Sequence, residues 1–242
     1  MDLCLKDKVV VVVGGAGNLG TVICDVLREE GAVVRIADIK LDSSHDMSKE
    51  KLARDYIQSV VQEHRRLDGL ITATYGGSEG KPFHATLASQ MKHEFHHTFL
   101  APFNSARMAA NWMSQNGGGG MVFVSSVNSG MGLNEVAYDV AKGALDRLAP
   151  DIAADYGKQG IHAVTLCPGT VGGTPSWEGR EEELARIARS IPDGRLTNAR
   201  EIAQAAAFFL SPHGKMFTGQ RIVCDRAWSL VKNTSEWKDI SK

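Results

Sequence analysis

Five consecutive valines at positions 9–13, followed at once by a glycine-rich turn, constrain the fold of this chain most strongly. Their continuous β-branched run, residues 8–15 with its flanks, predicts a strand covered on both faces in a parallel sheet. Apolar residues then recur at helical spacing over residues 21–30, Gly31 is a candidate C-cap, and residues 32–38 predict the next strand. Strand, turn, helix and strand within about 30 residues form a βαβ unit.

The same alternation continues along the rest of the chain. Helices are expected over residues 49–66, 89–113, 137–156 and 201–210, and strands over residues 69–74, 120–125, 161–167 and 221–224. No internal repeat or long linker interrupts the pattern, so we expect one domain over residues 1–242. Repeated βα units predict an α/β fold, a Rossmann-like doubly wound parallel sheet flanked by helices on both faces. Ligands of such sheets bind beyond the carboxyl ends of the strands.

Composition argues against several classes of function. The net charge is −1, so the chain lacks the basic footprint of a nucleic-acid-binding protein. No apolar run approaches the roughly 18–20 residues of a membrane span, and an acidic Asp2 with two lysines is unlike a signal peptide. The four cysteines are scattered without a C-x-x-C pair, as in reduced intracellular proteins. We therefore expect a cytoplasmic protein without nucleic-acid or membrane partners.

The glycine-rich turn "VGGAGNLG" predicts a dinucleotide site. Gly14, Gly17 and Gly20 recur every three residues between a strand and a helix, where backbone N–H groups can approach a pyrophosphate. Asp38 ends the second strand, and a carboxylate there binds the adenosine ribose and repels a 2′-phosphate. This favours NAD as the cofactor. The nearby Arg35 and Lys40 leave NADP as the alternative.

The segment "SSVNSGMGLNEVAYDVAKGAL" carries the strongest signal for chemistry. Tyr138 and Lys142 are four residues apart and therefore share one face of the expected helix. Ser125 and Ser126 stand at the end of a strand. A Tyr-x-x-x-Lys pair alone is common on protein surfaces, but downstream of a nucleotide-binding turn and a strand-end serine it is much more specific.

With these segments together, the sequence resembles the short-chain dehydrogenase/reductase family over nearly its whole length. The matching pieces, in the family's order, are "VGGAGNLG", Asp38, "LDGLI", "VFVSS", "YDVAK", "CPGTV" and "FTGQRIVCD". The glycine spacing is similar to the family's G-x-x-G-x-x-G variant. The resemblance implies that the cofactor is bound by Gly14, Gly17, Asn18, Leu19, Gly20, Asp38, Asp46, Met47, Thr74, Tyr138, Lys142, Pro168, Gly169 and Val171.

The resemblance also implies a mechanism, in which a hydride passes between a secondary alcohol, or its ketone, and the nicotinamide. Tyr138 would be the acid/base, although a phenol has an ordinary pKa of about 10. The Lys142 ammonium would favour the phenolate and bind the nicotinamide ribose. Ser126 would hold the substrate oxygen, and Ser125 remains the alternative because the spacing from Ser126 to Tyr138 is one residue shorter than usual.

Four departures from the family pattern stand out. Thr98 occupies the position of an asparagine that joins a proton relay in the family, so we assign Thr98 to the catalytic group. "TATY" (residues 72–75) replaces asparagine-asparagine-alanine-glycine, and "DRAW" (residues 225–228) replaces aspartate-glycine-glycine. Asp46 follows Asp38 so closely that the family's third strand should be short or missing.

The segment "MKHEFHHTF" fits the H-E-x-x-H pattern of zinc hydrolases. His93 and His97 would share a helix face, with Glu94 as a base. No third ligand can be identified downstream, so we expect a coincidence and no metal site. A degenerate nucleotide-binding or regulatory protein is the nearer alternative, although such a protein would more often lose Tyr138 or Lys142 than keep both.

Residues 170–196 predict a substrate lid, because two glycines and a proline precede an acidic-to-basic helix. Trp177 on this segment, together with Tyr75 and Met131, is a candidate for the substrate pocket beside Ser126. The resemblance further implies a homodimer or homotetramer, formed through the two long helices. The substrate would be a small alcohol or ketone whose identity the sequence does not specify.

Overall fold

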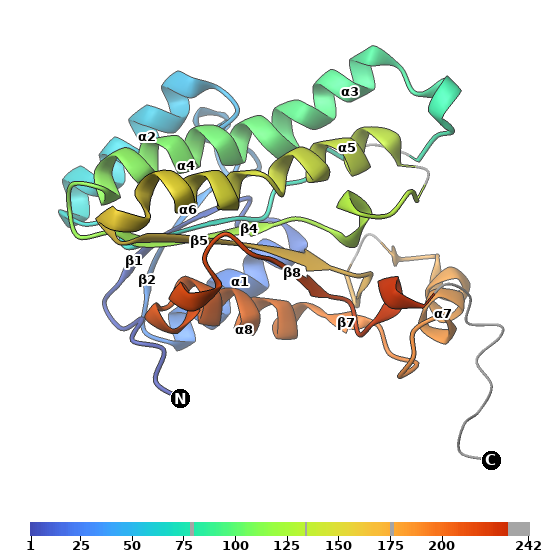
Figure 1. The fold of residues 1–242 in the computed structure, drawn as a ribbon. Coiled ribbons are helices and arrows are strands. Elements are labelled where there is room, and N and C mark those ends of the chain that lie inside the picture. Colours follow the sequence, from blue (N-terminus) through green and yellow to red (C-terminus); the bar gives the residue numbers. More distant parts are fainter. Residues whose placement is uncertain (78–79, 134, 175–176, 232–242) are drawn as a thin grey trace.

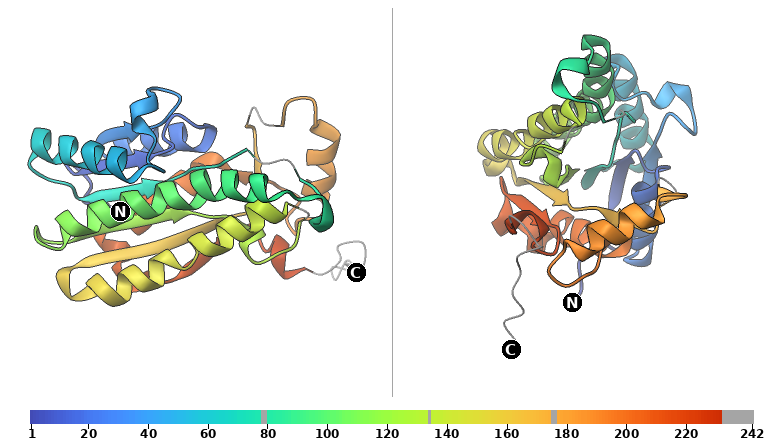
Figure 2. Two further views of the ribbon diagram at one scale, coloured as in Figure 1. Left: turned by 90° about the horizontal axis from the view of Figure 1, so that it is seen from above. Right: turned by 90° about the vertical axis from the view of Figure 1, so that its right-hand side faces the viewer.

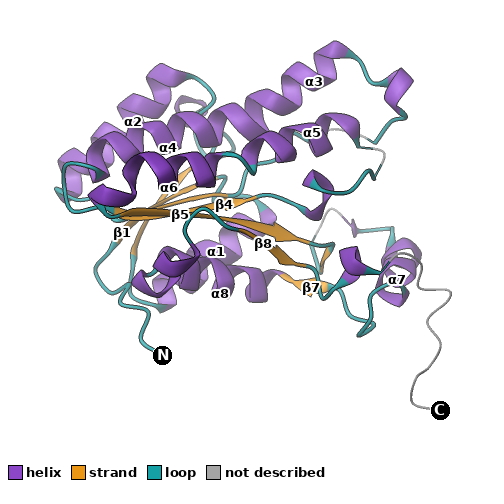
Figure 3. Ribbon diagram, viewed as in Figure 1, coloured by secondary structure: helices purple, strands orange, loops and turns teal. Residues whose placement is uncertain are grey.

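The computed structural model describes residues 1–77, 80–133, 135–174 and 177–231. Its centre is a six-stranded sheet in the order β2-β1-β3-β4-β5-β8, with every neighbouring pair parallel (Figure 3). The strands are β1 (Val9–Val13), β2 (Val33–Ala37), β3 (Gly69–Thr72), β4 (Gly119–Val124), β5 (Ile161–Pro168) and β8 (Arg221–Cys224). The strand order reverses at β1, which confirms the doubly wound topology and places the crevice for a ligand between the loops after β1 and β3.

Helices cover both faces of the sheet, as predicted. α1 (Asn18–Glu29) and α8 (Ala199–Leu210) lie on one face, and α2 (Glu50–His64), α4 (Ala101–Met113) and α6 (Leu148–Tyr156) on the other (Figures 1 and 2). Within β1, the odd-numbered valines enter the core beneath α2 and α4, and Val10 and Val12 enter the core against α1 and α8. This two-sided burial explains why the strand is apolar at every position.

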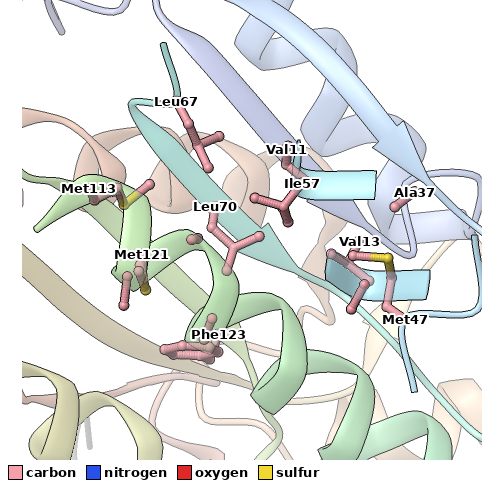
Figure 4. Close-up of a cluster of buried hydrophobic side chains, with 14 of the residues drawn as sticks. Val11, Val13, Ala37, Met47, Ile57, Leu67, Leu70, Met113, Met121 and Phe123 are labelled. Carbon is pink, nitrogen blue, oxygen red and sulfur yellow. The ribbon is translucent and has the colours of Figure 1, made fainter. Parts of the chain in front are cut away.

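The core beneath α2 and α4 also fixes one predicted cofactor residue. Figure 4 shows the Met47 side chain among Val13, Ala37 and neighbouring core residues, and its exposed fraction is 2%. A contact between Met47 and a cofactor therefore has to come from the backbone of this residue.

The chain between β2 and α2 explains the close spacing of Asp38 and Asp46. It forms turns and a short 3-10 helix, η1 (Ser43–His45), and no strand occurs in this described stretch. Strand β2 is consequently the edge of the sheet. The prediction of a short or missing third strand is confirmed.

The prediction of one continuous helix over residues 89–113 is wrong in one respect, because the helix is interrupted. It consists of α3 (Ala88–Phe95), a π-helical turn η3 (His96–Leu100) and α4. Pro102 lacks an N–H and cannot donate to the carbonyl of Thr98, so the regular α-helical ladder cannot continue there.

The helix expected over residues 137–156 is likewise two helices, α5 (Val136–Leu145) and α6. Pro150 accounts for the break, since its ring clashes with the carbonyl four residues earlier, that of Asp146. In both helices a proline inside a helical pattern was the available signal.

The predicted lid segment lies outside the central sheet. A two-residue strand β6 (Val171–Gly172) pairs with β7 (Thr197–Asn198), and α7 (Glu181–Arg189) between them has no buried residue. α7 lies beyond the carboxyl ends of the strands (Figure 1).

Other short helical turns are η2 (Phe83–Ala85), η4 (Val127–Ser129), η5 (Gly157–Gln159), η7 (Pro212–Phe217) and η8 (Trp228–Leu230). In the described part of the chain, no helix combines the length and the apolar character needed to cross a membrane.

Candidate active site

The glycine-rich turn after β1 fits a pyrophosphate. Gly14 has a φ of 78°, and a Cβ on it would lie 2.6 Å from the carbonyl oxygen of Ala73. A Cβ on Gly20 would lie 2.1 Å from the carbonyl oxygen of Gly14, so only glycine lets α1 pack so closely on the turn. The N-cap of α1, Gly17, provides no side-chain cap. The first backbone N–H groups of α1, which include those of Asn18 and Leu19, therefore suit an anionic ligand.

Asp38 follows β2 directly and lies against this turn. The residue is 7% exposed, and its carboxylate accepts hydrogen bonds from the backbone N–H groups of Ala16 (2.9 Å) and Lys40 (2.8 Å). The Arg35 guanidinium, by contrast, donates to Glu63 at 2.6 Å. Of the two cations near Asp38 in sequence, Arg35 is therefore held by a partner on α2.

The segment that contains Asp46 and Met47 is held in place by a residue that sequence reasoning missed. The Asn104 side chain, on α4, donates to the carbonyl oxygens of Met47 (3.2 Å) and Ser48 (2.9 Å). Burial works against the charged form of Asp46, but hydrogen bonds from Ser48 and Lys49 hold its pKa below the ordinary value. No sequence signal points to Asn104, because only the fold brings it to residues 47 and 48.

The predicted cofactor residues Pro168, Gly169 and Val171 lie at the carboxyl end of β5: Pro168 is its last residue, Gly169 follows it, and Val171 begins β6. Gly169 packs so closely on Asp225 that a Cβ on it would lie 2.9 Å from the Asp225 Cβ. The Asp225 carboxylate accepts from the backbone N–H groups of Ala227 (3.0 Å) and Ser229 (2.7 Å). The altered "DRAW" segment thus forms an ordered turn that supports this end of β5.

Lys142 is buried at the centre of the catalytic corner. The residue is 3% exposed, and its ammonium donates to the carbonyl oxygens of Val124 (2.7 Å) and Thr74 (3.2 Å). Its Nζ lies 5.5 Å from the centroid of the Tyr138 ring, on the same face of α5. Burial lowers the pKa of Lys142 to about 8. The Thr74 hydroxyl is buried and has no hydrogen-bond partner among the described residues.

Tyr138 and the two serines take distinct positions. Burial raises the pKa of Tyr138 above its ordinary value, and a hydrogen bond with Ser126 opposes that rise. The Ser125 hydroxyl instead donates to the backbone carbonyl of Lys142 at 3.3 Å. The structure therefore places Ser126, and not Ser125, beside the phenol.

A polar network that sequence reasoning missed orients Ser126. Its hydroxyl donates to the side-chain oxygen of Asn128 at 3.0 Å. The Asn128 amide donates in turn to the carboxylates of Asp139 (2.8 Å) and Glu135 (3.3 Å). Two acidic groups thus fix the orientation of the amide that holds the serine.

Thr98 lies in the π-helical turn, and its hydroxyl donates to the carboxylate of Glu94, one turn earlier. The backbone N–H of Gly76 donates to both, at 3.1 Å to Glu94 and 3.2 Å to Thr98. Both side chains are completely buried. Sequence reasoning considered Glu94 only as the base of a zinc hydrolase and missed this position.

The histidines of the zinc-like pattern lie on the same helix. The rings of His93 and His97 are 4.8 Å apart, and Nε2 of His93 is 2.9 Å from the carbonyl oxygen of Gly76. Within residues 1–77, 80–133, 135–174 and 177–231, no group of three or more His, Cys, Asp or Glu side chains could hold a metal ion.

Of the predicted substrate residues, the structure brings Tyr75 to the catalytic corner. Its ring is edge-on to that of Tyr138, with 5.3 Å between the centroids, and it is 59% exposed. Met131 follows the loop of Ser126, and its backbone N–H donates to the carbonyl of Asn128 at 3.4 Å. The Trp177 ring, on the predicted lid, packs against the guanidinium of Arg180 at 4.3 Å. The roles of Met131 and Trp177 in substrate binding remain predictions.

Several known proteins are similar to this chain in sequence or in fold. A family model described as enoyl-(acyl carrier protein) reductase matches residues 14–228. An uncharacterized oxidoreductase of Schizosaccharomyces pombe is 27% identical over 237 residues, 92% of this chain and 91% of that protein. The cis-4-hydroxycyclohexanecarboxylate dehydrogenase of Sinomonas cyclohexanicum is 27% identical over 251 residues, 96% of this chain and 100% of that protein. The fold is also that of ElxO, solved with NADP bound, at a TM-score of 0.85 and 18% identity, over 93% of this chain and 100% of that one.

Proposed function

The chain belongs to the short-chain dehydrogenase/reductase family, and from this premise we propose that it is an NAD-dependent oxidoreductase of secondary alcohols or their ketones. One observation carries the proposal: Ser126, Tyr138 and Lys142 meet at the carboxyl edge of the sheet, next to the glycine-rich turn. Members of the family use a nicotinamide cofactor. The choice of NAD and the class of substrate are the parts that need support from this chain's own residues.

Asp38 supports NAD. Its buried carboxylate is fixed against the glycine-rich turn by two backbone hydrogen bonds, where a 2′-phosphate would meet a negative charge. Arg35 is occupied by Glu63 and is therefore a poor candidate for binding that phosphate. Lys40 is the remaining nearby cation, and its side chain is exposed.

In alcohol oxidation, Tyr138 would take the hydroxyl proton while the carbon–hydrogen bond of the carbinol breaks and the carbonyl forms. A nicotinamide cofactor held beside Tyr138 and Lys142 would supply the hydride acceptor and, in its oxidised form, a positive charge that favours the phenolate. Because burial raises the pKa of Tyr138, the free phenol needs such nearby positive charge to become a base. Lys142 supplies a second positive charge, and Ser126 would hold the substrate oxygen between its own hydroxyl and that of Tyr138.

The proposed substrate class rests on the position of Tyr75 and on one relative. Tyr75 presents a partly exposed aromatic ring beside Tyr138, which suits an apolar ring or chain next to the reacting carbon. The relative from Sinomonas cyclohexanicum is, by its name, a dehydrogenase of a ring secondary alcohol. We therefore favour small cyclic secondary alcohols and ketones as first substrates to test.

The test is a titration of the purified protein with NADH and NADPH, followed by energy transfer from its tryptophans to the reduced nicotinamide. Tighter binding of NADH is expected, followed by turnover of cyclohexanol or cyclohexanone in a panel of secondary alcohols and ketones. Tighter binding of NADPH would refute the assignment of Asp38 and implicate Lys40. Binding without turnover across the panel would favour a regulatory nucleotide-binding protein.

We also propose that the chain forms a homodimer or homotetramer through the two long helical segments, α3 with α4 and α5 with α6. Val140 on α5 is an exposed apolar side chain on one of these helices. Light scattering at micromolar concentration should give at least twice the mass of one chain, and Val140→Glu should reduce it. A single-chain mass for the unaltered protein would contradict the proposal.

A further inference from the structure

Glu94 is an unusual residue to find in the interior. It lies in the last turn of α3 with an exposed fraction of 0%. A carboxylate so far from water is costly unless hydrogen bonds and nearby positive charge compensate for its lost hydration. Two hydrogen bonds come from the Thr98 hydroxyl and the backbone N–H of Gly76.

The loop after β3 connects this carboxylate to Lys142. The Lys142 ammonium donates to the carbonyl oxygen of Thr74 at 3.2 Å, and two residues later the Gly76 N–H donates to Glu94. Ammonium and carboxylate thus hold opposite ends of one short segment. A Cβ on Gly76 would lie only 2.6 Å from the Glu94 carboxylate, so a glycine here permits the close approach.

Several titratable groups surround Glu94 and Lys142. Burial lowers the pKa of Lys142, and the Glu94 carboxylate is the largest influence that opposes this effect, ahead of Asp146. Glu94 also acts on groups from the other elements around it, namely Tyr75, His97, Glu135 and Tyr138. Glu94 is therefore electrostatically coupled to both members of the Tyr-x-x-x-Lys pair.

We infer that Glu94 is a positioning residue of this active site: its buried carboxylate, held by Thr98 and Gly76, is the counter-charge that keeps Lys142 protonated. The inference rests on the proposed function, because a charged Lys142 matters only if Tyr138 acts as acid/base. It also gives Thr98 a specific task. The threonine hydroxyl, at the position where the family's asparagine was expected, donates a hydrogen bond to Glu94 and so fixes the carboxylate.

The sign of the effect follows from the charge. Removing a negative charge lowers the pKa of every group coupled to it. Without the Glu94 carboxylate, Lys142 would lose its proton at a lower pH, and the phenolate of Tyr138 would lose its positive neighbour there. The alkaline limit of activity should then move to lower pH.

The first experiment reads Lys142 directly in the full-length protein without substrate or dinucleotide. Isotope-labelled lysine reports protonation through its Cε chemical shift, and the Lys142 signal is assigned by its loss in Lys142→Arg. In Glu94→Gln, which keeps the shape and an acceptor oxygen, the pKa of Lys142 should fall by about one unit. Thr98→Val, the matched control, removes the hydroxyl but keeps the carboxylate and should give a much smaller shift.

The second experiment measures kcat against pH with saturating NAD and the best alcohol of the panel. Glu94→Gln should move the alkaline limit of kcat to lower pH. Glu94→Asp, which keeps the negative charge, should leave that limit close to its position in the unaltered protein. Thr98→Val should lower kcat without the displacement seen in Glu94→Gln. A purely structural role would reduce kcat in Glu94→Gln and leave the position of the profile unchanged.

The outcomes separate the two claims. An unmoved Lys142 signal in Glu94→Gln, or an unmoved kcat profile, overturns the inference while the dehydrogenase function stands. Absence of turnover in the unaltered protein overturns the proposed function, whatever the lysine signal does. If Glu94→Gln does not fold, labelled glutamate in the unaltered protein decides, because by reciprocity the Glu94 carboxyl signal must show an inflection where Lys142 titrates. A Glu94 signal without that inflection overturns the inference.

Discussion

The two ends of this active site are built in different ways. At the cofactor end, the groups offered to a ligand are backbone N–H groups at the start of α1, with the Asp38 carboxylate fixed beside them. At the catalytic corner, Glu94 and Lys142 are buried charges attached to either side of the loop after β3. Backbone groups do not titrate, whereas buried charges set one another's pKa values. The second end should therefore depend more strongly on pH than the first.

The largest expected effect separates the two ends completely. Tyr138→Phe should lower kcat by about a thousandfold, because the site loses its acid/base. Binding of NADH should remain within a few-fold of the unaltered protein, as measured by energy transfer from tryptophan. Tyr75→Phe, which alters the adjoining ring, is the control and should change kcat far less. A comparable loss in both variants would contradict the assignment of Tyr138.

Stability against pH should reveal the buried charge at the catalytic corner. The pKa of Lys142 is about 8 in the folded chain, below the ordinary 10.5. Between these values the unfolded chain binds more protons, so the contribution of Lys142 to the free energy of unfolding rises with pH. Relative to Lys142→Met, the unaltered protein should gain roughly 3 kcal/mol between pH 7 and pH 11. Urea denaturation across this range measures it, and two parallel curves would show that Lys142 keeps its ordinary pKa.

Two glycines allow the ends to be compared by one kind of substitution. In Gly20→Ala the new Cβ would meet the Gly14 backbone at 2.1 Å, which cannot yield, so a loss of about 2 kcal/mol in stability is expected. In Gly76→Ala the Cβ would meet the Glu94 carboxylate at 2.6 Å, and a side chain can rotate away. We expect a loss of about 1 kcal/mol together with a displaced kcat–pH profile, which Gly20→Ala should not show.

Thermal or urea unfolding measures both losses, and Gly132→Ala is the control because nothing lies within 4 Å of its Cβ. Equal losses of stability in Gly20→Ala and Gly76→Ala, with no change in the pH profile of Gly76→Ala, would mean that the two ends are built alike.

The same contrast explains what the sequence could predict. The strands, the sheet topology and the glycine-rich turn follow from local patterns, namely a run of valines, glycines at fixed spacing and helical periodicity. Tyr138 and Lys142 were also visible, because they share a helix face. Glu94, Asn104 and Asn128 were missed as parts of the site, since their roles depend on partners up to 57 residues away in the sequence or on burial, which a single sequence does not show.

The interruptions of the two long helices were missed for another reason. The helical periodicity is intact across Pro102 and Pro150, so the pattern of apolar residues alone predicts continuous helices. The ladder of backbone hydrogen bonds breaks nonetheless, because each proline lacks an N–H. In the first helix the break falls on the turn that contains Thr98, so the position that departs from the family also departs from regular helical geometry.

The smallest effect tests the cofactor end alone. Asp38→Asn keeps an acceptor oxygen but removes the charge, so NADH affinity should fall about tenfold through the loss of charge-assisted hydrogen bonds to the ribose. NADPH affinity should rise, because its 2′-phosphate no longer meets a carboxylate. The ratio of the two dissociation constants measures the change, with Asp42→Asn as a control that removes a nearby charge outside the turn. Since no titrating group changes at the catalytic corner, the kcat–pH profile of Asp38→Asn should keep its position; a displaced profile would show that the two ends are electrostatically one site.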